Sequence, residues 1–156
     1  MMIAEQQWGS YVNQMVFSNI TTCTTLICQA TNDNRLLGAH FVLVRDQQQT
    51  SYEGVLRGLR QLLGKDTIKR MYIVRVGEVW ENAGLLPEFA SQEFRADVQP
   101  DTFREALDYD GDVWVYETSG AGAGNKVSVV VDSHAECHVY VDGRMLRDAE
   151  FTVESP

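Results

Sequence analysis

The stretch that decides the fold runs Thr22-Cys-Thr-Thr-Leu-Ile-Cys-Gln-Ala30, then Thr31-Asn-Asp-Asn-Arg35, then Leu36-Leu-Gly-Ala-His-Phe-Val-Leu-Val44. The two outer segments are rich in residue types that suit a half-buried strand. The middle segment is polar, and Asn and Asp side chains bond to their own backbone and tolerate positive φ. The stretch therefore predicts a β-hairpin with strands at 22–30 and 36–44.

The length of the hairpin turn determines which cysteine shares a face with His40. Opposed residues of an antiparallel pair share a face, and a slip of one residue moves every side chain to the other face. A two-residue turn at 32–33 makes Cys23 and His40 diagonal neighbours on one face, roughly 7–8 Å apart. A three-residue turn puts Cys28 on the face of His40 instead. The sequence leaves both registers open.

A thiol and an imidazole on one face are the minimum requirement for nucleophilic acyl chemistry. The alternative interpretation is structural, because cysteines that form no disulfide are usually buried and inert. An imidazole within hydrogen-bond range of a thiol would favour catalysis. An imidazole beyond the range of Cys23 and Cys28, with no pocket around it, would favour a non-catalytic binding protein.

Composition narrows the classes of function. The chain has 156 residues, 44% hydrophobic and 22% charged, which predicts a single domain over 1–156 with a real core. A net charge of −9 disfavours nucleic acid and membrane partners and suits a protein partner with a neutral or basic surface. Three cysteines and an N-terminus without a secretory signal predict a reducing, cytoplasmic location, with signal-independent secretion as the alternative.

The rest of the chain predicts an α+β domain, a mostly antiparallel sheet or sandwich with two or three helices packed outside. The clearest helix is 51–63, with apolar side chains on one face, Ser51 at its start and Gly64 at its end; Gly54 and Gly58 would let it lie close to a sheet. Further helices are expected at 102–107 and 89–94. Further strands are expected at 11–20, 69–76, 112–117, 126–131 and 137–141, the last followed by a hairpin turn at 142–143 and a returning strand at 145–153.

Three other motifs are weaker. The acidic run 108–112 lacks the spacing of a calcium loop, and the glycines at 120–124 precede a strand rather than a helix, so they do not predict a phosphate site. His134, Cys137 and His138 are metal-ligand types, but neighbours on a strand point to opposite faces. We therefore predict no metal and no cofactor.

The hairpin resembles the core motif of the CheD family of bacterial chemotaxis-receptor glutamine deamidases. The residues that carry the resemblance are Cys23-Thr-Thr-Leu-Ile-Cys-Gln-Ala and Leu37-Gly-Ala-His40-Phe-Val-Leu, about 25 of the 156 residues, with the same cysteine-to-histidine offset. Bacterial deamidase toxins share that fold and its Cys–His dyad. The resemblance implies a cysteine hydrolase that converts glutamine to glutamate on a partner protein, as a bacterial enzyme or a secreted effector.

Carried over, the resemblance makes Cys23 the nucleophile and His40 the general base and acid. The family's threonine six residues before the cysteine is Phe17 here, and its glycine-rich run before the cysteine is absent. A third group should orient the imidazole. We expect it from Thr21, which shares strand parity with Cys23, with Ser18, Asn19 or a backbone carbonyl as alternatives. A toxin-like arrangement keeps Cys28 as the alternative nucleophile.

Overall fold

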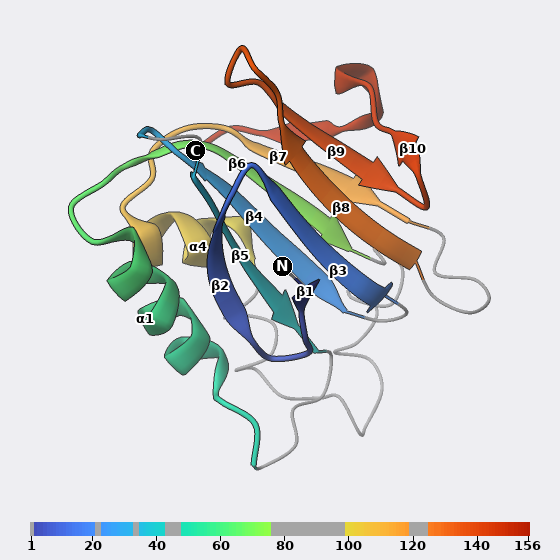
Figure 1. Ribbon diagram of the computed structural model, residues 1–156. Coiled ribbons are helices and arrows are strands. Elements are labelled where there is room, and N and C mark those ends of the chain that lie inside the picture. Colours follow the sequence, from blue (N-terminus) through green and yellow to red (C-terminus); the bar gives the residue numbers. More distant parts are fainter. Residues whose placement is uncertain (1, 21–22, 33–34, 43–47, 76–98, 119–124) are drawn as a thin grey trace.

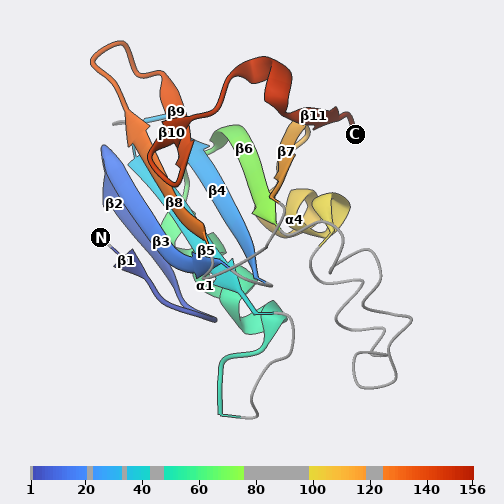
Figure 2. The same ribbon diagram turned by 90° about the vertical axis from the view of Figure 1, so that its right-hand side faces the viewer.

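The computed structural model describes residues 2–20, 23–32, 35–42, 48–75, 99–118 and 125–156. Two β-sheets lie face to face, and two helices cover the outer face of the larger sheet (Figures 1 and 2). The order of layers is therefore sheet, sheet, helices. The predicted α+β class with mostly antiparallel strands is confirmed.

The larger sheet contains the hairpin that the sequence predicts. Its strands, in spatial order, are β11 (Thr152–Glu154), β7 (Val113–Glu117), β6 (Ile68–Arg75), β4 (Thr24–Ala30), β5 (Arg35–Phe41) and β2 (Trp8–Val12). The hairpin β4–β5 is buried almost throughout, and β4 pairs with β5 on one side and with β6 on the other. Among the described strands of this sheet, β6 and β7 are the pair that runs parallel.

The smaller sheet covers the other face of the hairpin. Its strands, in spatial order, are β1 (Met2–Ile3), β3 (Gln14–Ile20), β8 (Asn125–Val131), β9 (Cys137–Val141) and β10 (Arg144–Met145). Alternate residues of β8 and β9 point inward, among them Val127, Val129 and Val139. They meet Ile27 and Val74 of the larger sheet in a core that lies between the two sheets.

The second core lies between the larger sheet and the helices α1 (Tyr52–Leu63) and α4 (Pro100–Leu107). The predicted caps of α1 are confirmed, since the Ser51 side chain accepts the Gly54 N–H at 3.0 Å and Gly64 follows the last turn with φ of 62°. A Cβ at Gly58 would overlap the Trp8 ring, so this glycine lets α1 approach β2. Gly54 instead faces the helix's own cap.

Two predicted strands are wrong in extent. The segment 11–20 is divided between β2 and β3 in different sheets, because Asn13 adopts a left-handed conformation, φ 71°, and turns the chain through the corner. The segment 145–153 leaves the smaller sheet after Met145, passes through the 3₁₀ turn η3 (Asp148–Glu150), and joins the larger sheet as β11. The packing of the Phe151 ring against Tyr72 and Trp114 stabilises this path between the two sheets.

The expected helix at 89–94 and the glycine run 120–124 lie outside the described residues. The strands on either side of that run, β7 and β8, belong to different sheets. Within the described part of the chain, neither helix is long and apolar enough to span a membrane.

Candidate functional site

The hairpin register determines which thiol shares a face with the histidine. In β4–β5, Thr25 pairs with His40 and Cys28 pairs with Leu37, which is the register expected for a two-residue turn. Cys23, two residues before Thr25, belongs to the core between the two sheets, towards which His40 also points. Cys28 belongs to the other core, beneath the helices. Of the two registers that the sequence left open, the one that puts Cys23 and His40 on the same face is observed.

Burial makes Cys28 a poor nucleophile as well as a misplaced one. Its side chain is fully buried, and the resulting desolvation raises the pKa of the thiol far above its usual range. A thiolate is the reactive form of cysteine, so a thiol held protonated at neutral pH is inert. Cys28 is therefore a core residue.

The His40 ring is held through one nitrogen. Nδ1 lies 3.2 Å from the carbonyl oxygen of Ile3 in β1. A carbonyl oxygen only accepts, so Nδ1 must carry the hydrogen, and in the neutral ring Nε2 then presents a lone pair. The edge of the imidazole also contacts the Phe17 ring, with 6.1 Å between ring centroids. The smaller sheet thus fixes both the orientation of the ring and its tautomer.

The other ring nitrogen is an unpartnered acceptor. Nε2 of His40 is buried and has no hydrogen-bond partner among the described residues, so it is not bonded to the Cys23 thiol. Burial lowers the pKa of His40, while the bond to the Ile3 carbonyl and the charge of Glu5 oppose that change. The imidazole is therefore neutral at pH 7, and the buried lone pair costs on the order of 1–3 kcal/mol.

Hydrogen bonds to Gln6 and Gln7 hold the backbone of His40 and of the residues that follow it. The Gln6 N–H donates to the His40 carbonyl at 2.6 Å, and the His40 N–H donates to the Gln7 carbonyl at 3.0 Å. The Gln6 side chain accepts the Val42 N–H at 3.0 Å and donates to the Thr50 carbonyl at 2.9 Å. Gln6 is fully buried and adopts a left-handed backbone conformation, φ 56°. Because these bonds connect three segments, they hold His40 in position.

Sequence reasoning missed both Gln6 and the role of Ile3. No motif or periodicity marks the segment 1–8, and a carbonyl oxygen has no signature in a sequence. Thr21, the residue expected to orient the imidazole, lies outside the described residues, as do the side chains of Ser18 and Asn19. The backbone-carbonyl alternative is the one for which the structure provides a contact.

The candidate pair lies deep between the sheets. His40 is 1% exposed and Cys23 is 3% exposed. Described residues line three of the cavities of the protein, one between α1 and α4, one beside the β8–β9 turn and one beside the N-terminus of α4. None of these three is lined by Cys23 or His40.

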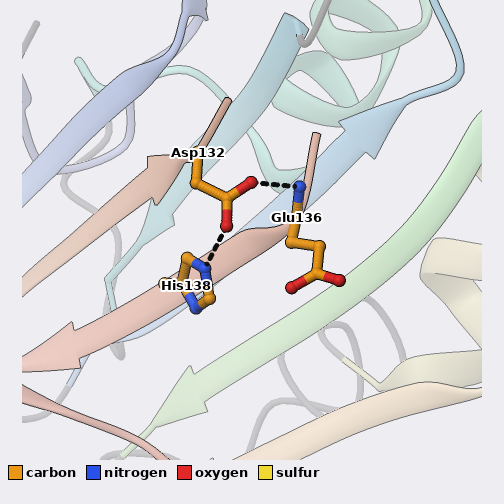
Figure 3. A group of neighbouring side chains, drawn as sticks. All are labelled: Asp132, Glu136 and His138. Carbon is orange, nitrogen blue, oxygen red and sulfur yellow. Dashed lines mark hydrogen bonds and ion pairs between the residues drawn. The ribbon is translucent and has the colours of Figure 1, made fainter. Parts of the chain in front are cut away.

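Of the three metal-ligand types near β9, Cys137 and His138 are the first two residues of the strand, and His134 lies in the turn before it. Cys137 lies beside Tyr72, and burial raises the pKa of its thiol to about 12. His134 is exposed in the β8–β9 turn. His138 instead pairs with Asp132, with 2.8 Å between Nε2 and Oδ2, and Glu136 lies close to both (Figure 3).

Comparison with protein-family models finds no match, and comparison with curated proteins finds none either. The resemblance of the hairpin to the CheD family therefore stays a prediction. Any functional proposal has to depend on the geometry of the described residues.

Proposed function

We propose that the protein is a cysteine-dependent protein-glutamine deamidase of the CheD type, with Cys23 as the nucleophile and His40 as the general base and acid. The observation that carries the proposal is the state of the His40 ring. Nδ1 is bound to a backbone carbonyl, and Nε2 is a buried acceptor without a partner among the described residues. Because Cys23 lies on the same face of the hairpin, its thiol is a candidate donor to this nitrogen.

The proposed reaction needs only these two side chains and water. Nε2 of His40 removes the proton from the Cys23 thiol, and the thiolate attacks the carboxamide carbon of a glutamine side chain. The C–N bond breaks as His40 returns the proton to the departing nitrogen, which leaves as ammonia. Water, deprotonated by the same nitrogen, then hydrolyses the thioester. The products are glutamate and the regenerated thiol, so no cofactor is required.

The Ile3 carbonyl takes the part of the third group in this scheme. It accepts the hydrogen on Nδ1, keeps the lone pair on Nε2, and stabilises the positive charge that the ring carries after it takes the thiol proton. Gln6 supports the same arrangement, because it fixes the backbone of His40 and of the segment that follows β5. The threonine of the CheD pattern is then not needed.

The thiol and imidazole must approach one another for the reaction to begin, since Nε2 is not bonded to Cys23 in this structure. Catalytic hydrogen bonds are often long before substrate binds and shorten in the complex. A desolvated site also strengthens the interaction between thiolate and imidazolium. The net charge of −9 favours a protein substrate with a neutral or basic surface, and a reducing cytoplasm would keep Cys23 reduced.

One observation favours a second function, that of a non-catalytic binding or adaptor protein. Nε2 of His40 is not hydrogen-bonded to a thiol, both Cys23 and His40 are buried, and neither side chain lines one of the three cavities named above, which is the geometry expected of a binding protein. In this alternative the two side chains serve as core residues, and the acidic surface binds a basic partner. The two proposals differ in whether the protein changes its partner covalently.

Mass spectrometry of partner proteins separates the two. The purified protein is incubated with a bacterial lysate, and glutamine-to-glutamate conversions are mapped by peptide sequencing. The deamidase proposal predicts conversions that are absent with Cys23→Ser and with His40→Asn but persist with Cys28→Ala. Two results would favour the binding protein. Glutamine-to-glutamate conversions could be equal for wild type and Cys23→Ser, or they could be absent from both while a partner protein is still captured.

A further inference from the structure

The turn between β8 and β9 brings three metal-ligand side chains together, away from the Cys23–His40 pair. Asp132 directly follows β8, Glu136 directly precedes β9, and His138 is the second residue of β9. One ligand atom from each lies within 4.8 Å of the other two. Figure 3 shows the Asp132 carboxylate between the His138 ring and the Glu136 backbone.

Backbone hydrogen bonds hold the Asp132 carboxylate in place. Its Oδ1 accepts the N–H of His134 at 2.8 Å and the N–H of Glu136 at 3.0 Å. Its Oδ2 faces Nε2 of His138 at 2.8 Å. These three contacts orient the carboxylate before any ion arrives.

We propose that Asp132, Glu136 and His138 bind a divalent transition-metal ion of the zinc type. An imidazole with two carboxylates is a nitrogen and oxygen donor set that Zn²⁺ accepts, whereas Ca²⁺ and Mg²⁺ prefer oxygen alone. The ion replaces the hydrogen that Nε2 of His138 donates to Asp132, and the neutral ring then carries its hydrogen on Nδ1. This set is not the group His134, Cys137 and His138 that the sequence suggested, and it shares only His138 with it.

The movement required is small. Ligand atoms lie about 2.0–2.2 Å from zinc, so the 2.8 Å separation between Nε2 and Oδ2 only has to widen slightly to admit an ion. The Glu136 carboxylate has to move closer, and the Glu136 side chain is exposed and able to rotate. Its backbone N–H stays on Asp132 during this rotation, so the turn is kept.

A neighbouring cavity gives the ion room for further ligands. Glu136 and His138 line a cavity of about 360 Å³ whose other charged side chains are Lys69, Arg70, Arg147 and Asp148. Three protein ligands with open coordination positions are typical of zinc sites that bind water or a substrate, whereas structural zinc sites are closed by four. The cationic side chains on the cavity wall suit an anionic group as the additional ligand.

Isothermal titration calorimetry with Zn²⁺ at neutral pH, on the full chain in a non-chelating buffer, tests the proposal. We expect one saturable site per chain. His138→Ala and Glu136→Gln should each weaken it by about tenfold or more, since even the loss of groups behind the ligands commonly costs 10–100-fold. Glu136→Gln keeps the backbone bond of the turn, so its effect is not one of folding.

His134→Asn is the matched control, because it removes an exposed imidazole from the same turn and keeps the backbone N–H that donates to Asp132. Zn²⁺ binding that is absent, that is unchanged by Glu136→Gln, or that falls equally with His134→Asn would overturn the proposal. Co²⁺ substitution adds a spectroscopic test. A thiolate charge-transfer band would assign Cys137 as a ligand and contradict the donor set, and its absence together with visible d–d bands supports the set.

Discussion

Replacing His40 with asparagine tests whether the fold keeps this imidazole neutral. The asparagine amide nitrogen occupies the place of Nδ1 and is still able to donate to the Ile3 carbonyl, whereas nothing replaces Nε2. Burial lowers the pKa of His40 in the folded protein relative to the unfolded chain, where a histidine titrates near 6.5. Below about pH 6.5 His40 therefore takes up a proton in the unfolded chain but not in the folded protein. Acid should then destabilise the wild type more steeply than the variant.

The size of the effect follows from proton linkage. Each pH unit over which only the unfolded chain is protonated lowers the free energy of unfolding by about 1.4 kcal/mol. From about pH 7 to about pH 5 the limit for one such histidine is therefore about 2 kcal/mol. The Ile3 carbonyl and Glu5 oppose the shift and bring the expected difference below that limit. The contribution is absent above the unfolded pKa and grows as pH falls.

Urea unfolding of wild type and His40→Asn at a series of pH values between these limits measures the difference in slope. His134→Asn serves as the control, because His134 is exposed in a turn. Only the dependence on pH is compared, since the variant also changes packing at the site. Parallel loss of stability in wild type and His40→Asn over this range would refute the claim that burial keeps the ring neutral.

Three further predictions concern the scaffold and the second thiol. Gly58→Ala should lower the free energy of unfolding by about 1–3 kcal/mol, measured by thermal or urea unfolding, because the new Cβ would meet the Trp8 ring. Alanine normally stabilises a helix relative to glycine, so a stabilised variant would contradict the contact. Ser51→Ala should cost about 1 kcal/mol by the same assay through loss of the bond to Gly54, and an unchanged midpoint would argue against the cap. Cys28→Ala should lower stability by about 1–2 kcal/mol through a small cavity and leave deamidation intact, so lost activity in a folded variant would contradict its assignment as a core residue.

The hairpin was predictable because three local signals agree. Two apolar segments rich in strand-forming residues and the polar turn between them all predict the same pairing, which the structure shows at 24–30 and 35–41, both buried almost throughout. The register of the hairpin was not predictable, since the polar segment 31–35 is compatible with a turn of two residues or of three. Helix α1 was predictable down to its caps, because its amphipathic period and its terminal Ser51 and Gly64 coincide.

The errors fall where the chain moves from one sheet to the other. A strand that changes sheets keeps its β-forming composition, so the corner at Asn13 and the crossing after Met145 leave no break in the pattern. The anchors of these crossings are long-range contacts, such as Phe151 on Tyr72. The contacts around His40 are of the same kind, because Ile3 and Gln6 lie more than thirty residues away in sequence.

Site-resolved alkylation of the cysteines tests whether His40 activates Cys23. The folded protein is treated with iodoacetamide over a range of pH, and the modification of Cys23, Cys28 and Cys137 is followed by peptide mass spectrometry. We predict that Cys23 is alkylated faster than the other two cysteines at neutral pH, because Nε2 of His40 takes the proton of its thiol. In His40→Asn the alkylation rate of Cys23 should fall to that of the other two. A Cys23 that reacts as slowly as Cys28, or at a rate indifferent to His40, would contradict this prediction.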